Sequence, residues 1–228
     1  MNKLQDFFYN QPKRRTIHKW EHYLEIYDKH FKKYQGKNPK ILEIGIYKGG
    51  SIDMWKYYFE GECTIYAIDI DQNCKQFEEP GVHIIIGDQG SSEFWDSFKE
   101  SNFDIIIDDG GHTMHQQIYS FERLYDRVID GGVYICEDTH TSYIEQTFNG
   151  GLNKQGTFIE YCKNFIDLLH VYYNQNRFSN IIGLELKNTS LTTDFRTKTQ
   201  CVSFYDSMVV LDKKIDTRLP NSILMKSG

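Results

Sequence analysis

The chain has 228 residues, of which 39% are hydrophobic and 25% are charged, so it can bury a sizeable core and is not an intrinsically disordered chain. Its formal net charge of −6 is not offset by an extended cluster of Lys and Arg, which argues against nucleic acid as the main partner. The sequence has no apolar run of about 18 residues and no apolar signal segment at its start, so we expect no membrane partner. Its five cysteines form no CxxC pair, which favours reduced thiols and a cytoplasmic location.

Residues 1–38 are expected to form an N-terminal helical arm. After a polar and aromatic start, apolar residues recur every three or four positions, as they do on one face of a helix. Thr16 would be the N-cap of this helix, and residues 36–39 (GKNP) would end it. The apolar face belongs either in the core or in a subunit contact, which leaves a homodimer as an open alternative. The apolar positions are Ile17, Trp20, Leu24, Tyr27 and Phe31.

The rest of the chain, residues 39–228, is expected to form one α/β domain. Five apolar runs alternate with helical patterns, which is typical of a doubly wound sheet of parallel strands. Two further runs, residues 201–205 and 208–211, predict an antiparallel hairpin at the sheet edge. Together they predict a Rossmann-like, mostly parallel, seven-stranded sheet. The five parallel strands are expected at residues 40–46, 64–71, 82–88, 105–107 and 133–136.

In the second half of the domain the sequence predicts two helices, a loop between them and a further apolar run. The helix after residues 103–112 is expected to carry Val128 on its apolar face and to end at residues 130–132 (DGG). Residues 139–156 are polar and contain glycine, so they are predicted to form an active-site loop, with a helix following from about residue 157 to residue 172. A further apolar run lies at residues 181–186.

Acidic residues and a histidine follow two of the expected strands. The segment FDIIIDDGGH is an apolar strand that runs into Asp108, Asp109 and His112, and the next strand ends in Glu137 and Asp138. Because the ligands of open α/β sheets bind at the carboxyl ends of the strands, these side chains are expected to lie at a functional site. Carboxylates placed so close together repel one another unless a cation holds them.

The residue types at this site favour a hard metal ion and a base. Carboxylate oxygens are the ligands that Mg²⁺ prefers. Zinc is the alternative, bound by His112 and His115, but no third nitrogen or sulfur ligand lies near them in the sequence. An imidazole has an ordinary pKa of ~6.5, near neutral pH, which suits His112 to act as a general base. For His115, His140 and His170 a surface or hydrogen-bonded position is the simpler interpretation.

The first three strands carry a nucleoside-binding pattern. A glycine turn at Gly45 joins the first strand to a helix, and Asp69 follows it by 24 residues, close to the spacing of a ribose-binding acid. Tyr47 stands where the GxGxxG pattern has its second glycine, which disfavours a diphosphate and hence a nicotinamide or flavin cofactor. Glu43, Asp69 and Asp88 at three successive strands are together a stronger signal than any of them alone.

Five segments together resemble a known enzyme family. In chain order they are ILEIGIYKGGS, IYAIDID, GDQ, FDIIIDDGGH and GGVYICEDTHTSY, and they cover roughly residues 40–213. They resemble class I S-adenosylmethionine (SAM) methyltransferases, and more narrowly the Mg²⁺-dependent sugar O-methyltransferases of macrolide and related antibiotic pathways. The combination of DDGxH with EDT is the most specific part of this resemblance. Two positions depart from the family: Gly111, where it usually has serine, and His140, where it often has tryptophan.

The resemblance implies an O-methyltransferase that uses SAM and Mg²⁺ and acts on a small-molecule acceptor, a sugar or a nucleotide-linked sugar. In that family the second acid of DDG and the ED pair bind the metal, and the histidine is the base. Carried over to this sequence, the metal ligands would be Asp109, Glu137 and Asp138, and the base would be His112. The residues expected to bind SAM are Glu43, Gly45, Gly49, Ser51, Asp69, Asp88, Gln89 and Asp108.

Two other functions are compatible with the sequence. A metal-dependent hydroxylase or hydrolase on the same fold would need the metal but would not bind SAM. A non-catalytic nucleoside-binding protein would bind SAM without any need for a metal. SAM binding and metal dependence, measured together, therefore separate the three functions.

Overall fold

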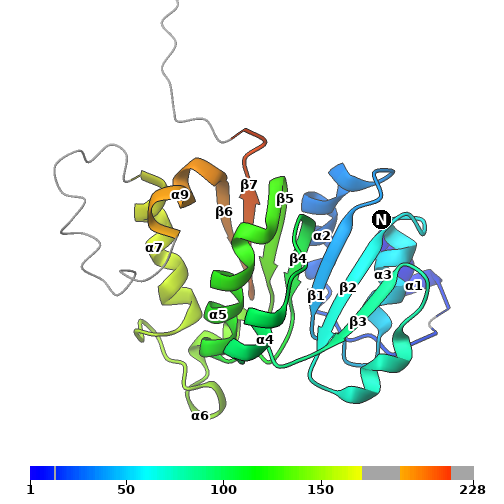
Figure 1. Cartoon of the computed structure of the whole chain (residues 1–228), viewed down its shortest axis with the longest axis horizontal. Helices are drawn as coiled ribbons and strands as arrows, with labels where there is room; N and C mark the ends of the chain where they lie inside the picture. Colours follow the sequence, from blue (N-terminus) through cyan, green and yellow to red (C-terminus); the bar gives the residue numbers. More distant parts are fainter. Residues whose placement is uncertain (13, 171–190, 217–228) are drawn as a thin grey trace, which may run out of the picture.

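The computed structural model describes residues 1–12, 14–170 and 191–216. Within them, seven strands form one sheet in the order β3-β2-β1-β4-β5-β7-β6 (Figure 1). Strands β1 to β5 are parallel to one another, whereas β7 runs antiparallel to both of its neighbours, β5 and β6. The predicted Rossmann-like sheet with a C-terminal antiparallel hairpin is therefore confirmed. The strands are β1 (Lys40–Ile44), β2 (Thr64–Asp69), β3 (Val82–Ile86), β4 (Phe103–Asp108), β5 (Val128–Cys136), β6 (Thr199–Tyr205) and β7 (Met208–Lys213).

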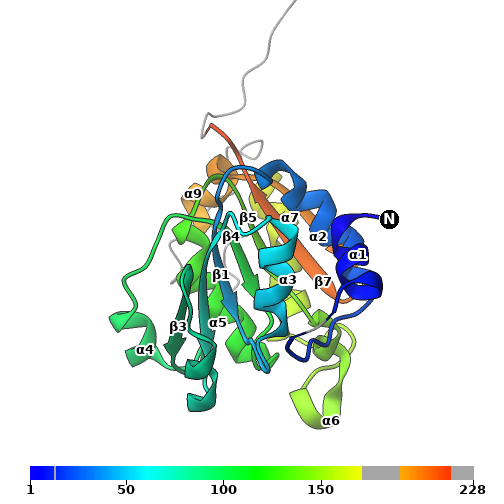
Figure 2. The ribbon, with the colours of Figure 1, turned by 90° about the vertical axis from the view of Figure 1, so that its right-hand side faces the viewer.

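Helices cover both faces of the sheet (Figures 1 and 2). Because successive residues of a strand point to opposite faces, the isoleucines of β4 enter two separate cores. Ile105 and Ile107 pack in one core and Ile106 in the other. The first core lies under α1 (Lys3–Asn10), α2 (Tyr23–Phe31) and α3 (Gly50–Tyr58), and the second under α4 (Ser92–Ser97), α5 (Met114–Leu124), α7 (Phe158–His170) and α9 (Leu191–Lys198). The shorter connecting turns are η1 (Lys32–Tyr34), η2 (Gln72–Phe77), η3 (Tyr125–Arg127), η4 (Thr139–Tyr143) and α6 (Glu145–Phe148).

The N-terminal helices pack against the sheet domain. α1 begins with a capping box, in which Asn2 and Gln5 exchange hydrogen bonds between side chain and backbone. It buries Leu4 and Phe7 in the same core that receives the aromatic face of α2. The aromatic stripe of the sequence therefore contributes to the core of its own chain.

The predicted start of the second helix at Thr16 is wrong. α2 begins at Tyr23, and residues 16–20 have no regular secondary structure. Trp20, which the periodicity placed on the apolar face, is 51% exposed. The cause is a close approach of backbones, since a Cβ at Gly50 would overlap the carbonyl oxygen of Thr16. This contact packs the backbone of Thr16 directly against the start of α3.

The predicted end of the helix after β4 is also wrong. That helix, α5, ends at Leu124, and Val128 already belongs to β5. Residues 130–132, which were expected to end the helix, lie within the strand. They form a bulge, because β5 has more residues than β4 between its first two paired positions. Gly131, with a φ of +74°, supplies the left-handed backbone that the bulge needs.

The segment after β5 is more ordered than predicted. Residues 139–156 contain η4 and α6, and Thr139, Thr141 and Ser142 of η4 are buried. The helix expected next is confirmed as α7, whereas the apolar run at residues 181–186 lies outside the described residues. All five cysteines are free. Within the described ranges, no helix has the length and apolar character needed to cross a membrane.

Candidate active site

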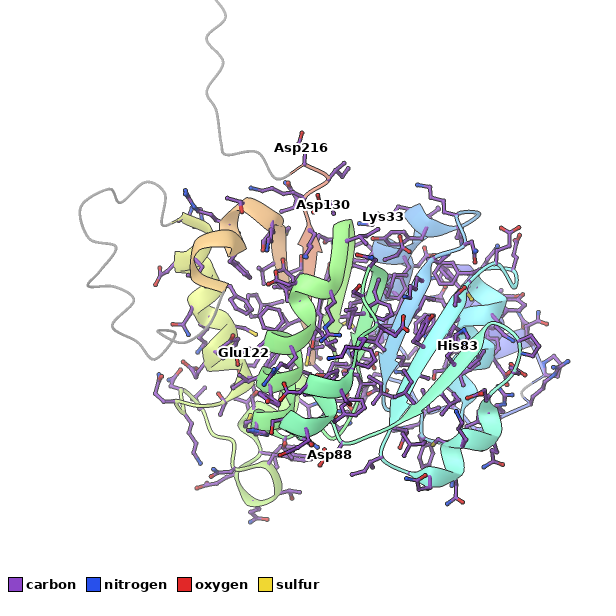
Figure 3. The ribbon with its side chains drawn as sticks, in the orientation of Figure 1. Lys33, His83, Asp88, Glu122, Asp130 and Asp216 are labelled. Carbon is purple, nitrogen blue, oxygen red and sulfur yellow. The ribbon has the colours of Figure 1, made fainter. Side chains whose placement is uncertain are left out.

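A cavity of about 530 Å³ opens at the carboxyl ends of β1 to β4. Figure 3 shows Asp88 at this end of the molecule, opposite to Lys33 and Asp130. Seven of the predicted site residues line the cavity and five do not. The seven are Gly45, Asp69, Asp88, Gln89, Asp109, His112 and Asp138, and the five are Glu43, Gly49, Ser51, Asp108 and Glu137.

The turn after β1 packs closely against the loop after β4. Gly45 has a φ of +82°, and a Cβ there would overlap a carbonyl oxygen of the loop after β4. Asp69 Oδ2 accepts hydrogen bonds from the backbone N–H groups of Ile46 and Tyr47, at 3.0 and 3.1 Å. Its Oδ1 accepts one from the N–H of Asp71 at 2.9 Å and can accept another. Asp69 therefore braces the turn and lines the cavity.

Gln89 joins the loops on two sides of the cavity. Its Nε2 donates to Asp108 Oδ1 and to Ser120 Oγ, both at 3.0 Å, and its Oε1 accepts from the Gly111 N–H at 2.7 Å. Burial raises the pKa of Asp108 to about 7, although the hydrogen bond from Gln89 opposes the rise. Gln89 and Asp108 thus support the DDGGH loop from behind, whereas Asp88 is exposed at the rim of the cavity.

Glu43 is fully buried behind the cavity. Its Oε2 accepts hydrogen bonds from Ser51 Oγ at 2.8 Å and Trp55 Nε1 at 3.1 Å, while Oε1 has no hydrogen-bond partner in the described part of the chain. Burial raises the pKa of Glu43 to about 7, and the charge of Lys19, whose Nζ lies 3.8 Å from Oε1, opposes the rise. Gly49 lies nearby in sequence and precedes α3 with a φ of +74°.

The predicted metal ligands Asp109, Glu137 and Asp138 are here called the acidic cluster. A lysine lies among them. Nζ of Lys19 lies 2.5 Å from Asp109 Oδ2 and 2.9 Å from Glu137 Oε2, and its side chain is only 3% exposed. The other oxygen of Glu137 accepts a hydrogen bond from the Tyr27 hydroxyl. Burial and the charge of Asp109 raise the pKa of Glu137, and Lys19 opposes this. Burial lowers the pKa of Lys19, but the charges of Asp109, Glu137 and Glu43 raise it more, so that Lys19 stays a cation.

His112 and Asp138 face each other at the edge of this cluster. His112 Nε2 lies 3.6 Å from Asp138 Oδ2 and 4.0 Å from Asp109 Oδ1. Both residues have a left-handed backbone, with φ of 56° for His112 and 53° for Asp138, which is uncommon for residues other than glycine. Thr141 Oγ1 fixes one of these turns by donating to the His112 carbonyl at 2.9 Å, and the Tyr23 hydroxyl donates to Asp138 Oδ1 at 2.8 Å.

Three of these side chains could hold a metal ion. One ligand atom each from Asp109, His112 and Asp138 lie within 4.8 Å of one another. Two carboxylates and an imidazole fit a divalent cation, and the buried Nδ1 of His112 has no hydrogen-bond partner among the described residues. Glu137, predicted as the third carboxylate ligand, bonds to the N-terminal segment. His115 is not part of the group, and its ring stacks on that of a tyrosine in α5.

Sequence reasoning missed the contribution of the N-terminal segment to this site. Lys19, Trp20, Tyr23 and Tyr27 all bond to carboxylates that were predicted to bind the metal. The aromatic spacing of this segment predicts only a core or subunit contact. One signal was present in the sequence, because Lys19 is a cation inside an apolar stripe and buried acids require a counter-ion.

No protein-family model matches the chain. It is 37% identical over 155 residues to mycinamicin VI 2''-O-methyltransferase of Micromonospora griseorubida, a match that covers 63% of this chain and 38% of that protein. It is 35% identical over 144 residues to demethylmacrocin O-methyltransferase of Streptomyces fradiae, covering 59% of this chain and 35% of that protein. The chain thus spans less than half the length of these curated relatives.

Solved structures agree with this result. The MycE methyltransferase from the mycinamycin biosynthetic pathway, in complex with Mg and SAH, superposes with a TM-score of 0.71 and 27% identity, covering 90% of this chain and 54% of that chain. A putative caffeoyl-CoA O-methyltransferase from Staphylococcus aureus superposes over 88% of this chain with a TM-score of 0.53 and 13% identity, which shows the fold alone. The resemblance indicated by the motifs is therefore confirmed: in sequence and in fold the chain is similar to sugar O-methyltransferases of antibiotic pathways.

Proposed function

We propose that this chain is a SAM- and Mg²⁺-dependent O-methyltransferase that acts on a hydroxyl of a sugar or of a sugar-bearing small molecule. The observation that carries the proposal is the convergence of an imidazole and two carboxylates on a cavity of ligand size at the carboxyl edge of the sheet. The relatives support it, because they are named O-methyltransferases and one is named for a rhamnosyl compound. The solved relative was determined with Mg and SAH, and also with mycinamycin VI.

The cofactor would lie against the ends of β1 to β3. Asp69 lines the cavity there and would accept a hydrogen bond from a ribose hydroxyl. Gly45 lines the cavity at the end of β1, and Tyr47 in place of a second glycine suits a ligand that has no diphosphate. Asp88, whose Oδ1 accepts from the Gly90 N–H at 2.7 Å, borders the cavity at the end of β3.

The acceptor would bind beside the acidic cluster. Asp109 and Asp138 would hold the metal ion from the ends of two strands, and Glu137 is the third carboxylate of the cluster. A bound ion would polarise the acceptor hydroxyl, and bound SAM would supply the electrophilic methyl group. Asp138 has a left-handed backbone and accepts a hydrogen bond from the Tyr23 hydroxyl, so its position would be set before any ligand enters.

In this proposal carboxylates alone hold the ion, so that His112 keeps a free nitrogen lone pair and would accept the proton of the acceptor hydroxyl. Its Nε2 lies 3.6 Å from Asp138 Oδ2 and 4.0 Å from Asp109 Oδ1, so both carboxylates would stabilise the ring once it is protonated. The hydrogen bond from Thr141 to the His112 carbonyl fixes the backbone that carries the ring. General base catalysis of this kind contributes about 10²–10⁴-fold to a rate.

The experiment that tests the proposal combines SAM, MgCl₂ and a panel of glycosylated macrolides and nucleotide sugars. We expect SAH and a monomethylated acceptor in the presence of Mg²⁺, and neither in excess EDTA. The isosteric variant Asp138→Asn should still bind SAM in calorimetry but should turn over poorly. Turnover in excess chelator would contradict the metal role. Absence of SAM binding to the wild-type chain would reject the whole proposal and favour the hydroxylase or hydrolase alternative.

A further inference from the structure

Residues 15–20, here called the strap, connect the cofactor cavity to the acidic cluster. At one end Arg15 is held by two carboxylates, with Nη1 3.3 Å from Asp53 Oδ1 and Nη2 3.3 Å from Glu79 Oε2. In its middle His18 lines the cavity. The strap has no helical or strand hydrogen bonds of its own, so its position depends on these side-chain contacts.

The other end of the strap uses the same carboxylates that a metal ion would need. Lys19 Nζ is in contact with Asp109 Oδ2 and Glu137 Oε2, and Trp20 Nε1 donates to Asp138 Oδ1 at 3.2 Å. An ion that took Asp109 and Glu137 as ligands would stand where the ammonium group now stands. Two cations so close together repel each other strongly, particularly where the side chain is 3% exposed.

We infer that Lys19 is a built-in competitor of the metal ion. Its ammonium group neutralises Asp109 and Glu137 when no ion is bound, and ion binding displaces it together with the strap. The inference rests on the metal site of the proposed function and adds to it a residue that sets the affinity for the ion. It also accounts for the stability of a buried acidic cluster before the ion arrives, because such a cluster needs a counter-ion.

Competition has a reciprocal consequence. If the seated lysine lowers the affinity of the site for the ion by some factor, the bound ion lowers the affinity of the site for the ammonium group by the same factor. Removal of the ammonium group should therefore tighten the binding of divalent ions by roughly 5–150-fold, the usual range for coupling between two sites. Because His18 belongs to the same strap, ion binding also changes the wall of the cofactor cavity.

Calorimetric titration with Mn²⁺ tests the competition directly. Lys19→Met should bind Mn²⁺ at least about fivefold more tightly than the wild type. Lys33→Met is the matched control, since it removes the same charge from a lysine that is 44% exposed and lies at the opposite end of the molecule (Figure 3), and its affinity should stay within about twofold. Equal or weaker binding by Lys19→Met would overturn the inference while leaving the proposed function intact. No binding by any of the proteins would overturn both the inference and the metal dependence.

Reductive methylation of lysines in the wild-type chain gives a test that needs no variant. Lys19 should be protected from formaldehyde and cyanoborohydride in EDTA, because its side chain is buried against two carboxylates. In saturating Mg²⁺ its labelling rate, followed by mass spectrometry of peptides, should rise several-fold. Lys33 should be labelled at the same rate in both conditions. Protection of Lys19 that persists in Mg²⁺, under conditions where calorimetry shows the ion bound, would overturn the displacement.

Discussion

The two halves of the cavity are built in different ways. The cofactor half, around Gly45 and Asp69, is held by contacts between nearby parts of the sequence, because the oxygens of Asp69 bind backbone N–H groups two to 23 residues away. The acidic half depends on a segment that is remote in sequence, since Lys19 bonds to Asp109 and Glu137 across 90 and 118 residues. The first half is therefore held by contacts that are close in sequence, whereas the second is held by the N-terminal strap when no ion is bound.

The largest effect is expected from a substitution in the acidic half that leaves the cofactor half unchanged. His112→Ala should lower kcat by roughly 10²–10⁴-fold, because the acceptor hydroxyl loses its base, and SAM affinity should change little. Steady-state kinetics as a function of pH is the measurement. The control is His83→Ala, a histidine that lies away from the site on β3 (Figure 3). An active His112→Ala enzyme that kept the acidic limb of the wild-type pH–rate profile would exclude His112 as the base.

The next largest effect is expected from a substitution in the cofactor half. Asp69→Ala should weaken SAM binding by about 1.5–3 kcal/mol, the range for hydrogen bonds to a charged group. Calorimetric titration with SAM measures this loss. Asp130→Ala removes the same charge from the opposite end of the molecule and should leave SAM affinity unchanged (Figure 3). Equal SAM affinities of Asp69→Ala and the wild type would place the ribose elsewhere.

A smaller effect is expected on stability. It tests whether a contact from the N-terminal segment stabilises the acidic half. Tyr27→Phe leaves one oxygen of the buried Glu137 without its hydrogen bond, which should lower the free energy of unfolding by about 1–3 kcal/mol. Tyr58→Phe is the matched control, because its partner Asp28, at 2.9 Å, is only partly buried and can turn to water. Urea denaturation compares the two. A loss for Tyr27→Phe no greater than that for Tyr58→Phe would show that the remote contact adds no stability.

The smallest expected effect concerns pH and the support behind the DDGGH loop. The pKa of Asp108 is raised to about 7 by burial, so between about pH 4 and 7 the folded chain holds a proton that the unfolded chain has released. Stability therefore falls as pH rises through this window and levels off above it. Asp108→Asn removes this contribution, and Glu43 keeps its own in both proteins. From pH 5 to 8 the wild type should lose about 1–2 kcal/mol more than Asp108→Asn in urea denaturation. Parallel pH curves would contradict the assignment of the titration to Asp108.

The elements that were predicted correctly from the sequence are those that short sequence patterns specify. The five parallel strands are apolar runs bounded by turn residues, and motifs such as DDGGH fix the strand ends within a few positions. The errors arose where tertiary contacts override a local pattern. Residues 16–20 have helical spacing but no regular secondary structure, with Thr16 packed against Gly50, and Val128 has helical spacing but pairs with β4.

The residues of the candidate site also differ in whether a short motif could predict them. Gly45, Asp69 and His112 could be named from short motifs, because each stands at a fixed place in a motif at the end of a predicted strand. The role of Lys19 could not, since no pattern within a window of ten or twenty residues links a lysine to acids that lie about a hundred positions further on. The order in which the strands stand in the sheet, which brings β4 and β5 beside the strap, is a global property of the chain.

The reversed direction of β7 has a consequence for how the protein is made. Because β7 runs antiparallel to β5, the turn of the β6–β7 hairpin lies at the carboxyl edge, where Ser207 accepts hydrogen bonds from the hydroxyl of Tyr23 across 184 residues. That same hydroxyl binds Asp138. A ribosome therefore releases every acid of the site well before the hairpin that braces them. The site is completed only when the earliest and the latest described segments of the nascent chain meet, which makes its assembly a late event in folding, with a long loop to close.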